Sequence, residues 1–213
     1  MPAQTRKTDR RTLYTRQVVK DALLELLEKN PYAKINVTML CKQAEITRPT
    51  FYLHYADLDE VLDEVIAEAL DIAEHSGTME DFETRDRHLR AVMENGPQAI
   101  RGNEKYLAPC QRIADAPKYR SLFMDDSLSY YIIRKIYLAE RDMSVAYLEK
   151  SCNLSHEDAD NIFLFMVHGL YYANRSMKWE KNDAWYRMQY LVNQLYIAGL
   201  EGIKALPEEF RKG

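Results

Sequence analysis

The stretch that decides the fold runs from residue 36 to residue 55 and reads NVTMLCKQAEITRPTFYLHY. Asn36 and Thr47 each have a short polar side chain that can cap the start of a helix. The first cap begins a helix through Ala44, and the second begins a helix from Arg48 to Tyr55, with a turn at 45–47. This spacing predicts a helix-turn-helix unit whose apolar residues pack against a preceding helix: Val37, Leu40, Ala44, Ile46 and Phe51.

The sequence on either side of this unit predicts two more helices. Between residues 13 and 27 the apolar residues fall on one helical face, and the Asn-Pro pair at 30–31 ends that helix. After the unit, Asp57 and Glu60 occupy the two acidic positions of a capping box, which opens a long helix toward His75. Four helices are therefore predicted before residue 76.

The remainder of the chain also predicts helices. Gly, Pro and Asn residues interrupt it at intervals, and the alternation of β-branched residues that is typical of strands is almost absent. Ser155, with Asp158 after it, caps a long helix that reaches about Trp179. A last helix starts at Asp183 or its neighbour and ends before Pro207. An all-α fold is the simplest interpretation.

Charge is distributed unevenly along the chain, whose net charge is -4. Residues 1–55 contain ten Lys or Arg residues and five Asp or Glu residues, whereas the remainder contains nineteen and twenty-eight. The most basic segment is the N-terminal arm, with Arg6, Lys7, Arg10, Arg11, Arg16 and Lys20. Such a segment suits the neutralisation of nucleic-acid phosphates, and a solvated disordered tail is the alternative.

The second helix of the unit presents small polar and cationic groups at its N-terminal end, which begins at Arg48. The major groove of DNA admits that end of a helix and brings its side chains to the base edges. Tyr52 and His54 follow on outer faces, where a hydroxyl and an imidazole can donate to phosphates, whereas Phe51 turns inward. The unit is therefore predicted to bind double-stranded DNA.

At these residues the chain resembles the TetR/AcrR family of transcriptional regulators. The resemblance rests on residues 35–37, 40–44, 57–61 and above all 46–55. It implies three helices for DNA, a linking fourth helix, and a body that binds a ligand and forms a homodimer on near-palindromic DNA. The resulting domain prediction is a helix-turn-helix DNA-binding domain with its basic arm at 1–56, and a larger helical ligand-binding and dimerisation domain at 57–213.

The resemblance also implies a set of DNA-contacting residues, namely Thr38, Thr47, Arg48, Pro49, Thr50, Tyr52 and His54. Thr47 has an alternative role as a helix cap alone, and Pro49 has one as a first-turn helix former. Arg48 favours a DNA role more strongly, because a cation at a helix N-terminus opposes the helix dipole and gains nothing locally.

The chain departs from the family pattern in two places. Glu45 stands in the turn where the family often has Gly, and a left-handed Glu45 costs about 1 kcal/mol relative to glycine. Ala56 and Leu58 stand where the family often has lysines, which removes phosphate contacts at that edge. The basic arm is expected to substitute for them.

Apolar stripes on the last two helices predict a dimer interface. The stripes would be buried in a four-helix bundle across a two-fold axis, and the alternative is that they meet inside one chain. Their members are Ala159, Ile162, Phe163, Met166, Leu170, Ala173 and Met177 on one helix, and Met188, Leu191, Val192, Leu195, Ala198, Gly199, Gly202 and Ile203 on the other.

Two other helix faces mix aromatic rings with polar groups, one on the helix predicted after Pro117 and one on the helix that Ser155 caps. Such faces suit a pocket for a planar or anionic effector, and the alternative is a core in which Arg134 pairs with a carboxylate. The predicted ligand-binding residues are Phe123, Tyr130, Arg134 and Tyr137 on the first face, and Phe165, His168 and Tyr172 on the second.

Other classes of function lack support in the sequence. No nucleotide-binding, metalloprotease or nucleophile-elbow motif is present, so no catalytic residue and no cofactor is expected. Cys41, Cys110 and Cys152 are widely spaced, which predicts neither a disulfide nor a metal site. Long apolar runs and a signal-peptide pattern are absent, which predicts a cytoplasmic protein that does not enter a membrane.

The predicted function is a sequence-specific DNA-binding transcriptional regulator, a repressor that an unidentified small-molecule effector releases from its operator. The alternative is a DNA-binding adaptor whose body binds a protein partner instead of a small ligand.

Overall fold

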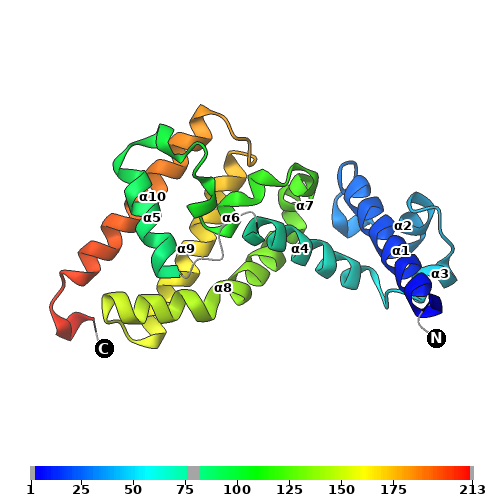
Figure 1. Cartoon of the computed structure of the whole chain (residues 1–213), viewed down its shortest axis with the longest axis horizontal. Coiled ribbons are helices and arrows are strands. Elements are labelled where there is room, and N and C mark those ends of the chain that lie inside the picture. Colours follow the sequence, from blue (N-terminus) through cyan, green and yellow to red (C-terminus); the bar gives the residue numbers. More distant parts are fainter. Residues whose placement is uncertain (1–2, 76–81, 212–213) are drawn as a thin grey trace. The chain divides into compact units, whose positions relative to one another are not determined.

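A computed structural model describes residues 3–75 and 82–211 of the chain. Within these two ranges the chain forms ten α-helices joined by turns and short 3₁₀ helices, and contains no strand (Figure 1). The predicted all-α fold class is confirmed. No helix in the described ranges is long and apolar enough to cross a membrane.

The chain divides into two compact units. The first contains Met1–Ala69 and Ser121–Tyr130, and the second contains Leu70–Arg120 and Tyr131–Gly213. These units do not coincide with the predicted division at residues 56 and 57. That division assigns functions to the two parts, and it stays a prediction.

The first unit is built around the N-terminal helices. It contains α1 (Ala3–Leu27), α2 (Val37–Gln43), α3 (Arg48–Tyr52), most of α4 (Leu58–His75) and most of α7 (Arg120–Met124). One face of α1 is buried together with the apolar residues of α2 and α3, as the helical spacing predicted. The fully buried members of this core include Val19, Leu23, Leu40 and Phe51.

Side-chain caps fix where these helices begin. The side chain of Asn36 accepts a hydrogen bond from the Met39 amide at 3.0 Å, and Thr47 caps α3 as predicted. At the start of α4, Asp57 accepts from the Glu60 amide at 2.9 Å. The Glu60 carboxylate reaches back to the amide of Ala56 at 2.6 Å, one residue earlier than in a standard capping box.

Two cations of the basic arm lie against α4. Arg16 donates to Glu64 at 2.9 and 3.1 Å, and Lys20 donates to Glu68 at 2.7 Å. Burial raises the pKa of Glu64, but the hydrogen bonds from Tyr55 and Arg16 outweigh it and bring that pKa below its ordinary value.

These ion pairs correct the expectation that Arg16 and Lys20 neutralise phosphates, because each already has a carboxylate partner. Arg10 and Arg11 are exposed and remain available for that role. The side chains of Arg6 and Lys7 lie outside the described part of the chain.

The second unit contains four long helices and one short one. They are α5 (Phe82–Glu94), α6 (Pro109–Arg112), α8 (Ser129–Cys152) from its third residue onward, α9 (His156–Ser176) and α10 (Asp183–Lys204). Ser155 caps α9 through the Asp158 amide at 3.1 Å, as predicted. Asn182 caps α10 through the Trp185 amide at 2.9 Å.

The helix α9 ends three residues before the predicted Trp179. Lys178 and Trp179 both have left-handed backbones, with φ values of 52° and 48°, and this turns the chain toward α10. The indole of Trp179 is buried and donates to the carbonyl of Cys110 in α6 at 3.1 Å. A tertiary contact therefore sets this helix end.

The prediction of a single continuous helix after Pro117 is wrong. The helix α7 ends at Met124, and α8 starts only at Ser129. Between them Asp125 accepts from the Ser127 amide at 2.8 Å and from the Tyr32 amide at 2.6 Å, which holds the chain in a turn. Residues before and after this break do not share one helical face.

Candidate DNA-binding surface and ligand cavity

The turn between α2 and α3 has a closely defined geometry. Glu45 has a φ of 53°, so it adopts the left-handed backbone whose cost the sequence analysis considered. The Ile46 amide donates to the Cys41 carbonyl at 3.0 Å, and the Glu45 amide donates to the Lys42 carbonyl at 3.3 Å. These two bonds form a Schellman motif, in which the left-handed position normally holds glycine.

We expect the substitution Glu45→Gly to stabilise the protein. Glycine adopts the left-handed backbone without strain, so the free energy of unfolding should rise by about 1 kcal/mol. Urea denaturation measures it. Glu45→Ala is the matched control, because alanine removes the carboxylate but keeps the left-handed strain. An equal gain in both variants would assign the effect to charge rather than to the backbone.

The seven predicted DNA-contacting residues lie on α2, on α3 and in the turns beside α3. Thr38, Thr47, Arg48, Pro49 and Tyr52 are exposed, whereas Thr50 and His54 are half-buried. The Thr47 hydroxyl accepts from the Thr50 amide at 3.3 Å and lies 2.9 Å from the Thr50 hydroxyl. The cap therefore uses Thr47 and leaves the first turn of α3 open to solvent.

Arg48 is the cation of this surface. Its Nη2 donates to the Tyr52 hydroxyl at 3.5 Å, and this contact raises the pKa of Arg48. Phe51 turns inward, as predicted, and is fully buried. The helix α3 ends at Tyr52 rather than at Tyr55, so His54 stands in the following turn, where its carbonyl accepts from Arg16 at 3.1 Å.

The second unit contains a partly open cavity of about 560 Å³. Its wall is formed by α5, the start of α6, α8, α9 and α10, and most of the wall is apolar. Burial, together with Glu140, raises the pKa of the Cys110 thiol in this wall to about 12. That thiol stays protonated at neutral pH, which fits the structural role expected for the cysteines.

The predicted ligand-binding residues do not surround this cavity. Phe165 alone is in its wall, and that side chain is 75% exposed. Phe123 is fully buried in the first unit, Tyr130 and Tyr172 are mostly exposed, and Arg134 is exposed. The half-buried Tyr137 donates to Asp160, and His168 is half-buried outside the wall. The expectation that these seven line one cavity is wrong.

The two faces of α9 do not divide as the sequence predicted. Four residues of the apolar stripe expected at the dimer interface lie in the cavity wall, namely Ile162, Phe163, Met166 and Leu170. The aromatic face expected in the cavity is largely exposed, with Phe165 and Tyr172. Helical periodicity separated the two faces correctly, but it does not indicate which one faces inward.

The polar residues in the wall were missed by the sequence analysis. They are Arg85 and Asp86 on α5, Gln111 on α6, Glu140 and Ser144 on α8, and Asn193 on α10. Each stands singly in a mostly solvent-facing or apolar helix, so no local pattern marks it. Gln111 continues into a buried chain of hydrogen bonds, donating to Gln189 at 2.6 Å, and Gln189 donates to Asn174 at 2.6 Å.

The described residues contain no cluster of three or more His, Cys, Asp or Glu suited to a metal ion. Their three cysteines are all buried and form no disulfide.

Comparisons with known proteins concern the sequence and the fold. No family model matches the chain. A relative from Bacillus subtilis (strain 168), described as the uncharacterized HTH-type transcriptional regulator YxbF, is 39% identical over 62 residues. That match covers 29% of this chain and 16% of the relative.

Among solved structures, the dihydroxyacetone kinase operon activator DhaS superposes with a TM-score of 0.50 at 16% identity. The superposition covers 89% of this chain and 97% of DhaS. The chain shares its overall fold with DhaS. The TetR family repressor AlkX from Dietzia sp. strain DQ12-45-1b gives a TM-score of 0.38 at 15% identity, over 89% of this chain and 96% of AlkX.

The relative YxbF is described as a transcriptional regulator and DhaS as an operon activator.

Proposed function

We propose that the chain is a transcriptional regulator that binds a near-palindromic operator as a homodimer and is released from it by a small-molecule effector. The observation that carries the DNA-binding part is the start of α3, where a capped and solvent-exposed first turn presents Arg48 and Pro49. A helix with this end exposed can enter the major groove and bring those side chains to base edges.

The dimer is supported by an exposed face on α9 and α10. Phe165 and Leu195 are 75% and 72% exposed, and Leu191 and Tyr172 are about half exposed. Residues 164–172 and 188–200 contain no Asp, Glu, Lys or Arg. An uncharged apolar face meets a second copy of itself without charge repulsion, as a two-fold interface requires.

The small residues on this face allow two helices to approach closely. Apart from the backbone of its own helix and its two chain neighbours, a Cβ atom built at Gly169, Gly199 or Gly202 meets no atom of the described residues within 4 Å. No packing inside the protomer therefore requires these glycines. They leave room for a second copy at a helix crossing.

Control by an effector is supported by the cavity in the second unit, whose volume of about 560 Å³ lies within the range of small-molecule sites. The dimer would have two arrangements, of which one binds the operator more tightly. An effector shifts the protein toward the arrangement for which the effector has the higher affinity, and the difference between its two affinities sets the size of the change in DNA binding. Repression follows if that dimer blocks transcription when it occupies its operator.

Selection of bound sequences from a random duplex DNA library tests the DNA-binding part. We expect enrichment of two inverted half-sites whose centres lie about 34 to 36 Å apart, or a multiple of it, because two recognition helices must meet the same groove on one side of the duplex. Enrichment of no sequence above the starting library would contradict the proposal.

A further inference from the structure

The wall of the cavity contains both ionic and apolar regions. Arg85 and Asp86 on α5 and Glu140 on α8 are its charged residues, and the apolar side chains come mainly from α9 and α10. Arg85 Nη2 lies 3.9 Å from Glu140 Oε2, so the one cation in the wall has a carboxylate beside it. An anionic ligand therefore finds no unopposed positive charge there.

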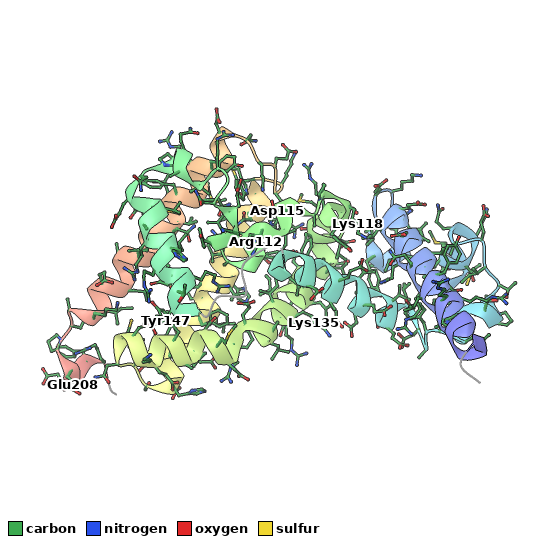
Figure 2. The ribbon with its side chains drawn as sticks, viewed as in Figure 1. Arg112, Asp115, Lys118, Lys135, Tyr147 and Glu208 are labelled. Carbon is green, nitrogen blue, oxygen red and sulfur yellow. The ribbon has the colours of Figure 1, made fainter. Side chains whose placement is uncertain are left out.

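Asp86 has one satisfied and one unsatisfied oxygen. Its Oδ2 accepts from Arg90 Nε at 2.7 Å and from the hydroxyl of Tyr147 at 2.8 Å. Tyr147, which is labelled in Figure 2, lies on α8. Asp86 Oδ1 is buried and accepts no hydrogen bond. Several described residues have a buried side-chain atom that lacks a hydrogen-bond partner. Among them, Asp86 is the one that lines the cavity. Because such an acceptor is costly to leave unsatisfied, a donor from a ligand would be favoured here.

The charge of Asp86 is already opposed. Arg90 contacts Asp86 at 2.7 Å and Glu201 at 2.9 Å, and Lys204 contacts the same Glu201 at 3.1 Å. A cationic ligand would add an extra charge to a balanced group, and desolvating that charge is unfavourable. The missing element is thus a hydrogen-bond donor that carries no charge.

A second polar group stands at the same end of the cavity. Tyr196 on α10 lines the wall, and burial, followed by the nearby Asp86 and Tyr147, raises its pKa. The phenol therefore stays neutral at physiological pH. Its hydroxyl can both donate and accept, so it suits a ligand hydroxyl that binds Asp86.

We propose that the cavity binds an uncharged amphiphile, with a hydroxyl group that donates to Asp86 Oδ1 and an apolar body that lies against α9 and α10. The proposal rests on the proposed function in one respect, which is that the cavity is the effector site. It replaces the planar or anionic effector that the sequence suggested.

Four matched probes test this on the full-length protein: decanol, decyl methyl ether, decanoate and decylammonium, each below its micelle-forming concentration. Isothermal titration calorimetry gives the affinities. We expect decanol to bind about tenfold tighter than the ether, because the ether has no donor for Asp86. Decanol should also bind tighter than either ion, because an ion must lose its hydration to enter the cavity.

The substitution Asp86→Asn should reduce the preference for decanol over the ether, because a neutral amide oxygen is a weaker acceptor than a carboxylate. Glu83→Gln is the matched control, since it makes the same chemical change at an exposed residue of α5 outside the cavity wall. It should keep the tenfold preference. If Asp86→Asn fails to fold, the four affinities of the unmodified protein still decide.

Equal affinity for decanol and the ether, or tighter binding of either ion, would overturn the proposal of an uncharged hydroxyl-bearing ligand. The assignment of the cavity to an effector would remain. Failure of all four probes to bind a protein that still selects its DNA would overturn both the proposal and the assignment of the cavity to an effector. The DNA-binding function would stand in either case.

Discussion

The variant Gly199→Trp is expected to be monomeric and to lose about 100- to 10,000-fold in operator affinity. A bulky ring at a close helix crossing overpacks the interface between two copies. Once the protomers separate, each half-site is bound independently, and the gain from holding both at once disappears. Sedimentation velocity measures the oligomeric state, and titration of the selected duplex measures the affinity.

This substitution separates assembly from folding. Among the described residues, an added Cβ at Gly199 meets no neighbouring atom outside its own helix within 4 Å, so we expect the chain to fold with an unchanged circular dichroism spectrum. Ala139→Trp is the matched control at an exposed position of α8, and it should remain a dimer. If Gly199→Trp sediments as a dimer and Ala139→Trp does not, the interface involves α8 rather than the α9 and α10 face.

The second large effect is expected from Arg48→Ala. Arg48 is exposed at the start of α3, and its side chain donates to the hydroxyl of the exposed Tyr52, so its removal should leave the fold intact. If the guanidinium reads a guanine, affinity for the preferred duplex should fall about tenfold or more per half-site. The loss should be confined to one symmetric pair of base positions, where the sequence preference should relax. Affinity measured against single-base variants of the duplex checks this.

Lys34→Ala is the appropriate comparison for Arg48→Ala. Lys34 is another exposed cation of the first unit, and a contact from it to phosphate would weaken all sequences alike and flatten the salt dependence. A uniform loss across all duplexes in Arg48→Ala would show that Arg48 also contacts phosphate, and would contradict its assignment to base recognition.

The helix-turn-helix could be predicted in detail because its signals are local. Asn36 and Thr47 cap through amides three residues away, and Glu45 adopts the conformation that the turn requires. Each of these interactions lies within about one helical turn, so the sequence itself contains both partners. The exception was the end of α3, which stops earlier than its apolar pattern indicated.

The ligand site could not be predicted in the same way. The predicted face on the helix after Pro117 failed because the turn at Asp125 separates Phe123 from Arg134, and this turn is held partly by Tyr32 from a distant part of the chain. The role of Asp86 was not visible in the sequence, since only its partner Arg90 lies nearby on α5, whereas Tyr147 and the neighbouring Tyr196 come from α8 and α10.

The sequence by itself determined the all-α class, the caps and the exposed residues of the DNA-binding unit, because helix periodicity and capping are properties of neighbouring residues. The tertiary structure alone decided which face of α9 lines the cavity and which faces solvent. Both faces carry enough apolar surface to be buried, and packing against α5, α8 and α10 leaves Ile162 and Met166 half-buried in the cavity wall while Tyr172 lies outside it, about half exposed. The tertiary structure also decided the ion pairs of Arg16 and Lys20 with α4. Opposite charges that are far apart in the sequence become partners only after the helices pack together.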